Sequence, residues 1–222
     1  MLDKDIYPFF IELKQNNHKD WFDLNRKRYE HLRQNFVAFT KEVIQGIAEF
    51  DPSIALQDAS KAVFRINRDV RFSANKDPYK THIAFSLSPG GRTSEFASYY
   101  FQLDPANPFA GAGVYAPQPD TLKAIRNEMY FNPDAFLKSI QTPKFKKIFG
   151  GLDEIESLKK APKGFEDAAD KIIPYLKHKH FVASVGLQKK DIFSADFAQK
   201  LVEIYKAEKE FVAFLNDAIR NA

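Results

Sequence analysis

Hydrophobic positions spaced three or four residues apart dominate the first fifty residues and predict two helices. Ile6, Phe9, Phe10 and Leu13 share one face of a helix over residues 5–15. Asn16-Asn17 interrupts this pattern, which resumes near residue 20 and runs to about residue 50. Asp51-Pro52 then ends the second helix, because proline removes a backbone donor and clashes with the preceding turn. The N-terminal part, about residues 5–50, is therefore predicted to be helical.

The C-terminal part of the chain returns to helical spacing. It predicts helices over residues 119–129 and 133–140, followed by an irregular stretch over 141–164 and a strand over 181–187. A long helix is expected over 194–219. Its apolar stripe consists of Phe197, Leu201, Ile204, Tyr205, Phe211, Leu215 and Ile219.

Between these parts, over about residues 61–116, the period changes from 3.6 to 2, which is typical of strands. Residues 82–87 and 95–103 read as two strands joined by a hairpin at Ser88-Pro89-Gly90-Gly91-Arg92, and residues 111–115 read as a third. Strands in mid-chain with helices on both sides favour an α+β fold over alternating βαβ units. We expect one compact domain over residues 1–222 with an antiparallel or mixed sheet, whose last part, about 118–222, is helical and irregular.

The most informative segment is residues 64–73, read as a further strand in which alternate side chains point to opposite faces. One face would carry Phe64, Ile66, Arg68, Val70 and Phe72, and the other Arg65, Asn67, Asp69, Arg71 and Ser73. An arginine on an otherwise apolar face must find an anion, because a guanidinium stays charged in proteins. That anion is either a carboxylate of the protein, with Asp69, Glu95 and Glu128 as candidates, or a ligand.

The amino-acid composition excludes several classes of protein but does not indicate a function. The 222 residues include 22 Phe and no Cys, which predicts a Phe-rich core and excludes disulfide or thiolate chemistry. The N-terminus lacks the basic and apolar regions of a secretory signal, and no apolar run is long enough for a membrane helix. We therefore expect a cytoplasmic protein without a membrane partner. The oligomeric state stays open.

The net charge of +4 is unevenly distributed. Residues 61–82 hold six basic and two acidic side chains, and residues 138–200 hold thirteen basic and eight acidic ones. Residues 1–60 are slightly acidic. Two basic blocks suggest an anionic partner, although lysines in loops are commonly just solvated.

Other motifs give weaker signals. Residues 111–115 contain two of the three glycines of a dinucleotide-binding loop, and a strand that needs glycine for close backbone packing explains them better. His178 and His180 are close in sequence, but no third ligand has metal-site spacing. We predict no metal and no cofactor. His82 beside the arginines has the right chemistry for proton transfer, but an ordinary position at a strand end explains it better.

Four blocks, in chain order and spanning nearly the whole sequence, are similar to the motifs of a known family. They are Asn16-Asn17 with Trp21-Phe22, Asn25-Arg26 and Tyr29; Arg65-x-x-Arg68-Asp69-x-Arg71-Phe72-Ser73 with Lys76 and Pro78-Tyr79-Lys80-Thr81-His82; Gly113-x-Tyr115-x-Pro117 with Leu122 and Ile125-Arg126; and Leu158-Lys159-x-x-Pro162-x-Gly164-Phe165. By these blocks the chain resembles the bacterial family of the domain of unknown function 2461.

The resemblance implies one compact domain with a shared feature built on Arg68, Arg71, Tyr79, Lys80 and Arg126, and it implies no reaction. The chain departs from the family pattern in two places. Residues 74–77 lack one expected charge pair, and an expected Asp-His-Pro-like segment is replaced at residues 166–170.

Three functions remain open. The first is a pocket beside the arginine strand that binds a small phosphorylated or carboxylated ligand; catalysis there would be hydrolysis or group transfer. The second, less favoured, is a nucleic-acid binding module that uses both basic blocks. The third is a structural or protein-interaction domain with the arginines in a salt-bridge network. For the first, the ligand-binding residues would be Arg65, Arg68, Arg71, Lys80 and Arg126, with Tyr79, His82 and Tyr115 as candidates for a catalytic or polar contact.

Overall fold

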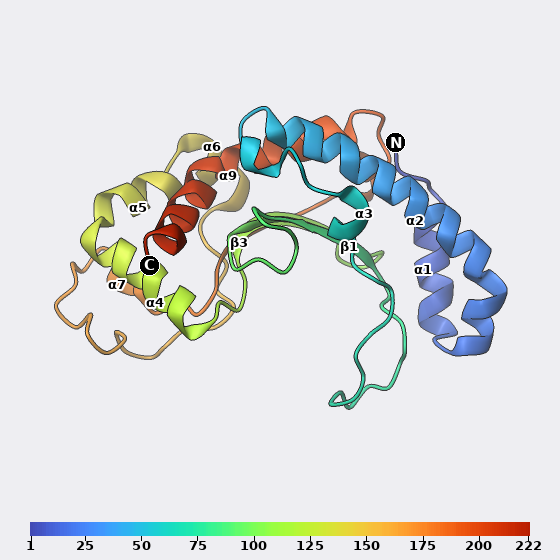
Figure 1. The fold of residues 1–222 in the computed structure, drawn as a ribbon, viewed down its shortest axis with the longest axis horizontal. Helices are drawn as coiled ribbons and strands as arrows, with labels where there is room; N and C mark the ends of the chain where they lie inside the picture. Colours follow the sequence, from blue (N-terminus) through green and yellow to red (C-terminus); the bar gives the residue numbers. More distant parts are fainter. The chain divides into compact units, whose positions relative to one another are not determined.

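The computed structural model describes residues 1–222 and has helices at both ends of the chain (Figure 1). The N-terminal part consists of α1 (Ile6–Gln15), α2 (Lys19–Ala48), η1 (Pro52–Ile54) and α3 (Ala59–Ala62). Three strands follow: β1 (Ile83–Leu87), β2 (Ser98–Leu103) and β3 (Phe109–Val114). The remaining elements are α4 (Pro119–Phe131), α5 (Pro133–Ile140), α6 (Pro143–Phe149), α7 (Ile173–Leu176), β4 (Phe181–Gly186), α8 (Lys189–Ile192) and α9 (Phe197–Arg220).

The four strands form one antiparallel sheet in the order β1-β2-β3-β4. A turn in which the N–H of Gly91 donates to the carbonyl of Ser88 (2.8 Å) lies in the predicted hairpin connection between β1 and β2. The segment between β3 and β4 carries α4 to α7. The α+β class, with its sheet in mid-chain and helices at both ends, is therefore confirmed. None of the helices combines the length and apolar character that crossing a membrane would need.

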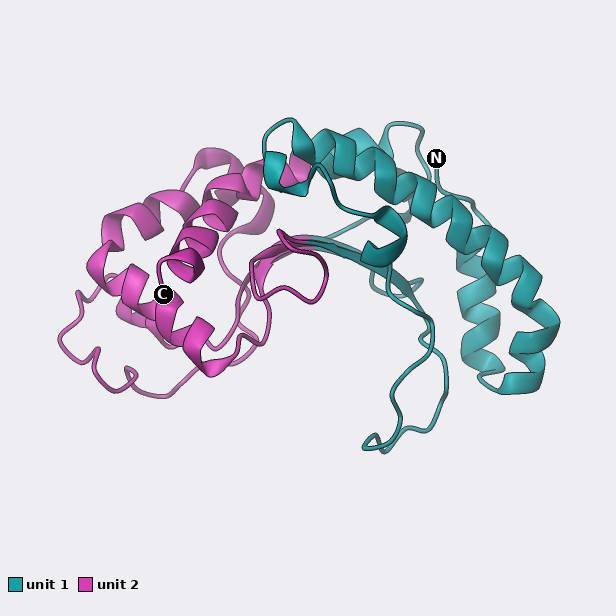
Figure 2. Ribbon diagram, in the orientation of Figure 1, with its two compact units in different colours: residues 1–87, 100–110, 186–202 teal, residues 88–99, 111–185, 203–222 magenta.

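Contacts within the chain gather into two compact units, shown in separate colours in Figure 2. Unit 1 comprises Met1–Leu87, Tyr100–Ala110 and Gly186–Val202, and unit 2 comprises Ser88–Tyr99, Gly111–Val185 and Glu203–Ala222. Each unit is described on its own below. The assignment of residues 1–222 to a single domain stays a prediction.

Unit 1 has the aromatic core that the composition predicts. The ring of Phe9 in α1 lies 5.8 Å from the rings of both Trp21 and Tyr29 in α2. Further along α2, Phe39 stacks on Phe197 with ring centroids 5.5 Å apart. Rings of this size bury large apolar areas and add a favourable geometry of their own. Packing thus explains the phenylalanines of α1 and α2, all of which are buried.

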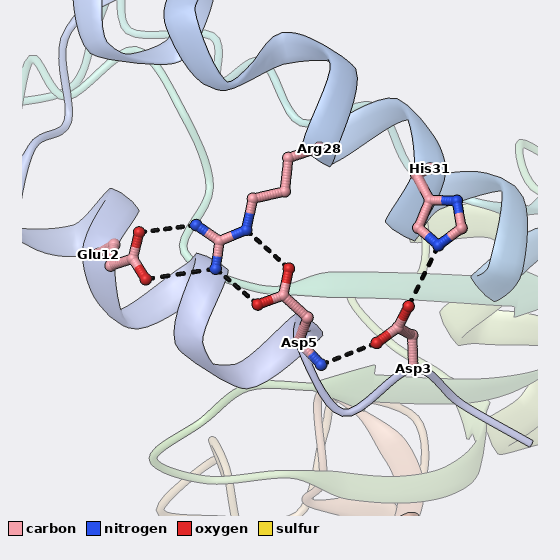
Figure 3. A network of polar contacts seen from close by, with 5 residues as sticks. All are labelled: Asp3, Asp5, Glu12, Arg28 and His31. Atoms are coloured by element: carbon pink, nitrogen blue, oxygen red, sulfur yellow. Dashed lines mark hydrogen bonds and ion pairs between the residues drawn. The ribbon is translucent and has the colours of Figure 1, made fainter.

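Arg28 of α2 ties the two N-terminal helices together (Figure 3). Its Nε and Nη2 donate to the carboxylate of Asp5, both at 2.7 Å, and its Nη1 donates to Glu12 at 2.7 Å. His31 lies 3.2 Å from the carboxylate of Asp3. The hydrogen bond from Arg28 lowers the pKa of Asp5, more than burial raises it. Both carboxylates of the Arg28 pairs are considerably exposed, so these ion pairs contribute modest stability.

In unit 2, two glycines of β3 allow β4 to approach closely. A Cβ on Gly111 would lie 2.1 Å from the carbonyl oxygen of Ala183, and one on Gly113 would lie 2.0 Å from that of Phe181. Gly113 also has φ +134°, which strongly favours glycine. The expectation that these glycines serve close backbone packing is confirmed.

Helix α9 supplies buried acceptors to backbone groups of unit 2. The Oδ1 of Asn216 accepts the N–H of Ala97 at 2.8 Å, and the Oε1 of Glu208 accepts the N–H of Ala112 at 2.7 Å. Both side chains are buried. Such pairing is expected, because an unpaired buried amide is costly.

Two sequence-based expectations about local structure are wrong. Residues 64–73 do not form a regular strand: only Asn67 makes a bridge, with Tyr79. The ladder stops there because the next partner, Pro78, has no N–H to donate. Residues 141–164 are not wholly irregular, since they contain α6. Thr142 caps this helix by accepting the N–H of Phe145 at 3.2 Å.

Candidate anion-binding arm

The segment around the arginines folds back on itself as a long hairpin in unit 1, here called the basic arm (residues 64–80). In Figure 1 it is the teal hairpin that leads into β1. The N–H of Arg68 donates to the carbonyl of Pro78, and the N–H of Lys80 donates to that of Ile66, both at 2.8 Å. These bonds hold two extended limbs side by side, with residues 69–77 as the loop between them.

Asn17, in the connection between α1 and α2, anchors the base of the basic arm. Its side-chain amide makes two hydrogen bonds with the backbone of Tyr79: Oδ1 accepts the N–H and Nδ2 donates to the carbonyl, both at 3.0 Å. The ring of Tyr79 is buried and stacks on Phe22 with centroids 4.2 Å apart. Two of the blocks quoted for the family resemblance therefore meet here. Tyr79 serves as an anchor of the arm in this structure.

The basic side chains of the arm bind neutral acceptors. Arg68 is half-buried and donates to the carbonyl of Asp77 at 2.9 Å and to the hydroxyl of Ser73 at 3.3 Å. Lys76 donates to the carbonyl of Val70 at 3.0 Å. The guanidinium of Arg65 is exposed and forms no ion pair, although its charge helps to lower the pKa of Asp69. Arg65, Arg68 and Lys76 therefore all lack a carboxylate partner.

The three carboxylates considered as partners of Arg68 have other partners. Asp69 binds Arg71, Glu95 accepts the hydroxyl proton of Thr121 at 2.5 Å, and Glu128 accepts from Asn132 at 2.8 Å. Of the two alternatives considered for Arg68, pairing with one of these acids is therefore not found, and binding of a ligand stays a prediction. Arg68 is accessible enough to stay hydrated, so backbone oxygens suffice as partners.

Arg71 is the one arginine of the arm that pairs with a carboxylate. Its Nε and Nη2 donate to the two oxygens of Asp69 at 3.0 and 2.6 Å. This pairing lowers the pKa of Asp69 and raises that of Arg71. Both side chains are exposed, so the pair orders the loop without burying charge.

The end of the arm exposes an aromatic ring. The N–H of Ser73 donates to the carbonyl of Val70 at 3.3 Å and closes a turn at Arg71-Phe72. The side chain of Phe72 is 97% exposed. The expectation that Phe72 shares an inward face with Ile66 is wrong, because the turn interrupts the alternation before it reaches residue 72. The Arg71 guanidinium lies 5.9 Å from the ring centroid.

Lys80 and His82 lie beyond the pairing limbs. The ammonium group of Lys80 donates to the carbonyl of Arg65 at 2.7 Å and lies 5.6 Å from the ring centroid of Phe64. Burial lowers the pKa of His82, Asp104 opposes this shift, and Lys80 adds to it. Burial therefore favours the neutral form of His82.

Arg126 and Tyr115 belong to unit 2, where each has partners of its own. Arg126 is half-buried and donates to the carbonyls of Leu176 at 2.9 Å and His178 at 3.1 Å. Burial lowers its pKa. The exposed ring of Tyr115 stacks on His180 with centroids 4.7 Å apart. The contacts of Arg126 and Tyr115 within unit 2 account for their positions.

The two histidines close in sequence do not form a metal site. His180 accepts the N–H of Ala116 at 2.9 Å through Nδ1, and His178 is buried with a lowered pKa caused by desolvation. No group of three or more His, Asp or Glu side chains is placed to hold a metal ion.

Sequence reasoning missed Glu208, the most deeply buried acid in the chain. Its side chain is fully buried, and Oε2 has no hydrogen-bond partner. Desolvation raises the pKa of Glu208 well above its usual value, and Asp153 adds to this while the N–H of Ala112 opposes it. A signal was present, because Glu208 lies three residues after Tyr205 and three before Phe211, on the apolar stripe of α9.

The chain belongs to the conserved hypothetical protein family DUF2461, whose model matches residues 5–214. This confirms the resemblance drawn from the sequence blocks. No curated protein and no solved structure gives a significant match to the chain.

Proposed function

We propose that this member of the DUF2461 family binds an anionic ligand that carries phosphate or carboxylate groups, through the basic arm. The observation that supports this most strongly is that Arg65, Arg68 and Lys76 lie on one hairpin without carboxylate partners. Arginine and lysine side chains recognise phosphate and carboxylate, the arginine through its planar fork of donors.

The local charge supports the same proposal. Residues 64–80 carry five basic and two acidic side chains, and one of the acids is engaged by Arg71. Hydrogen bonds to backbone carbonyls shape the arm but leave its positive charge uncompensated. A concentration of charge of one sign on a projecting segment attracts oppositely charged ligands from solution.

The proposal concerns binding and assigns no reaction. The contacts of Tyr79 with Asn17 and Phe22 give it a structural role as an anchor of the arm. Burial disfavours the charged form of His82. A cytoplasmic location, where phosphorylated compounds and nucleic acids are abundant, belongs to the same proposal.

The test is thermal denaturation at fixed ionic strength with three probes: tripolyphosphate, citrate and a single-stranded oligodeoxythymidine. A ligand that binds only the native state raises the melting temperature by mass action. We expect at least one probe to raise it for the wild-type protein. We expect the shift to disappear in the double variant Arg65→Gln/Lys76→Gln, whose side chains are exposed and contribute nothing to the core.

A matched control removes two exposed positive charges elsewhere. Lys41→Gln/Lys123→Gln changes the net charge equally, at exposed positions of α2 and α4. We expect this control to keep the full shift. The proposal is wrong if no probe shifts the wild-type protein, or if both double variants lose the shift to the same extent.

A further inference from the structure

We infer that the anion bound by the basic arm is a single-stranded nucleic acid, with a base stacked on Phe72. This inference rests on the proposed function and adds a chemical class to it. It starts from the turn at the end of the arm, where a phenylalanine that is 97% exposed directly follows Arg71.

Phe72 contrasts with the other aromatic residues of unit 1. The phenylalanines of α1 and α2 are buried in the core, whereas Phe72 lies on a charged loop where folding gives it no apolar surroundings. The contact of its ring is with the Arg71 guanidinium, 5.9 Å from the ring centroid. Nucleic-acid bases stack on exposed aromatic rings whatever their sequence, since every base has a π face.

The spacing of the cations favours a chain of phosphates over one small anion. Arg65 and Arg68 are three residues apart on one limb, about 10 Å if that limb is extended, and this odd spacing places them on opposite faces of the limb. Arg71 lies further along and is paired with Asp69. A single phosphate is gripped by donors that converge on it, whereas a polynucleotide offers a charge at every nucleotide. The arm thus combines cations distributed along its length with a stacking platform, the two parts of single-strand binding sites.

An anionic membrane would also attract basic residues, but the arm has little to insert into it. Membrane-surface segments bury a whole apolar face, and the turn offers one apolar side chain between charged or polar neighbours. Nucleic acid therefore fits the arm better than a lipid surface.

The experiment measures fluorescence anisotropy of a labelled oligodeoxythymidine of about twelve nucleotides, within the site sizes typical of such proteins. We expect Phe72→Ala and Phe72→Leu each to weaken binding about tenfold, because leucine keeps apolar surface but cannot stack. Phe72→Tyr keeps an aromatic ring and should stay within about twofold of wild type. Leu56→Ala, at a side chain that is 98% exposed, is the control for losing an exposed apolar group.

Salt dependence tests the phosphate contacts separately. Removing two contacts in Arg65→Gln/Lys76→Gln should reduce the slope of log K against log salt concentration by about 1.4. Phe72→Ala should leave this slope unchanged, because it removes no charge.

The possible failures are distinguishable. If the oligonucleotide binds wild type and Phe72→Ala equally, or if a duplex of the same length binds as tightly as the single strand, the inference is overturned while the proposed function stands. A second failure is that phosphatidylserine vesicles bind in a Phe72-dependent way and the oligonucleotide does not bind. The partner of the arm is then an anionic membrane and not a nucleic acid. If neither the oligonucleotide, tripolyphosphate nor citrate binds, the proposed function fails as well.

Discussion

Replacing Glu208 by glutamine should remove a pH dependence from the folding stability of the protein. The buried carboxyl group accepts the N–H of Ala112 through Oε1, while Oε2 has no partner. Glutamine has nearly the same shape and keeps an oxygen for Ala112. The substitution therefore removes the ionisable group and little else.

The sign follows from the direction of the pKa shift. Burial raises the pKa of Glu208 in the folded state, so above its unfolded-state pKa, about 4.5, the folded protein retains a proton that the unfolded chain releases. The free energy of unfolding then falls as the pH rises, by about 1.4 kcal/mol per pH unit, until the pH passes the raised pKa. Glu208→Gln lacks this loss. Its stability relative to wild type should rise by the same amount per pH unit across that window.

The assay is urea-induced unfolding followed by far-ultraviolet circular dichroism, at several pH values between about 3 and 8. Glu210→Gln, on an exposed position of the same helix, controls for losing one acidic group from α9. At the acid end, where the carboxyl group is protonated in both states, Glu208→Gln and wild type should differ by less than about 1 kcal/mol. A difference between them that stays constant over the whole pH range would refute the reasoning.

Two further substitutions test the packing and the ion pairs. Gly113→Ala should destabilise folding by about 3 kcal/mol, because its φ of +134° strains any side chain and the new Cβ would lie 2.0 Å from the Phe181 carbonyl. The control is Gly151→Ala, whose Cβ would have nothing within 4 Å and should change stability little in the same urea titration. Arg28→Met should cost about 1 kcal/mol at neutral pH. That cost should shrink in urea titrations near pH 3, because the pKa of Asp5 is lowered in the folded state and the stability it contributes is lost as the pH falls below the unfolded value of 3.8.

The sequence was most informative where one physical period persisted over many residues. The apolar stripes of α2 and α9 each continue for several turns. A polar residue at one position of the stripe therefore does not change the prediction of a helix. The helix α6 is shorter, and lysines interrupt its apolar positions. For this reason the pattern did not predict a helix there, and the segment was read as part of an irregular stretch. Its start at Thr142-Pro143 and its end at Gly150 (φ +76°) were nevertheless typical helix boundaries.

The candidate site was located by its residue types, but its chemistry depended on contacts that pattern alone does not give. Alternation placed Phe72 inside, and that expectation failed at the turn that closes the arm. Of the two anions considered for Arg68, a protein carboxylate is not its partner, and a ligand stays a prediction. The partner of Tyr79 is Asn17, 62 residues away in the sequence. The spacing of apolar residues within one segment cannot predict a contact between segments so far apart. Glu208 was visible as a carboxylate on an apolar stripe, yet its partner Ala112 could only be known from the fold.

The hydrogen bonds of the arm bear on how well it could bind. A flexible loop loses conformational entropy when a ligand orders it, and that loss weakens affinity. Here Asn17 fixes the base through the backbone of Tyr79, while Arg68 and Lys76 bind carbonyls across the loop. Because these acceptors are neutral, they order the arm without cancelling its charge. Carboxylates in the same places would have ordered it equally but neutralised the cations, which is why the choice of backbone acceptors favours a binding role over a purely structural one.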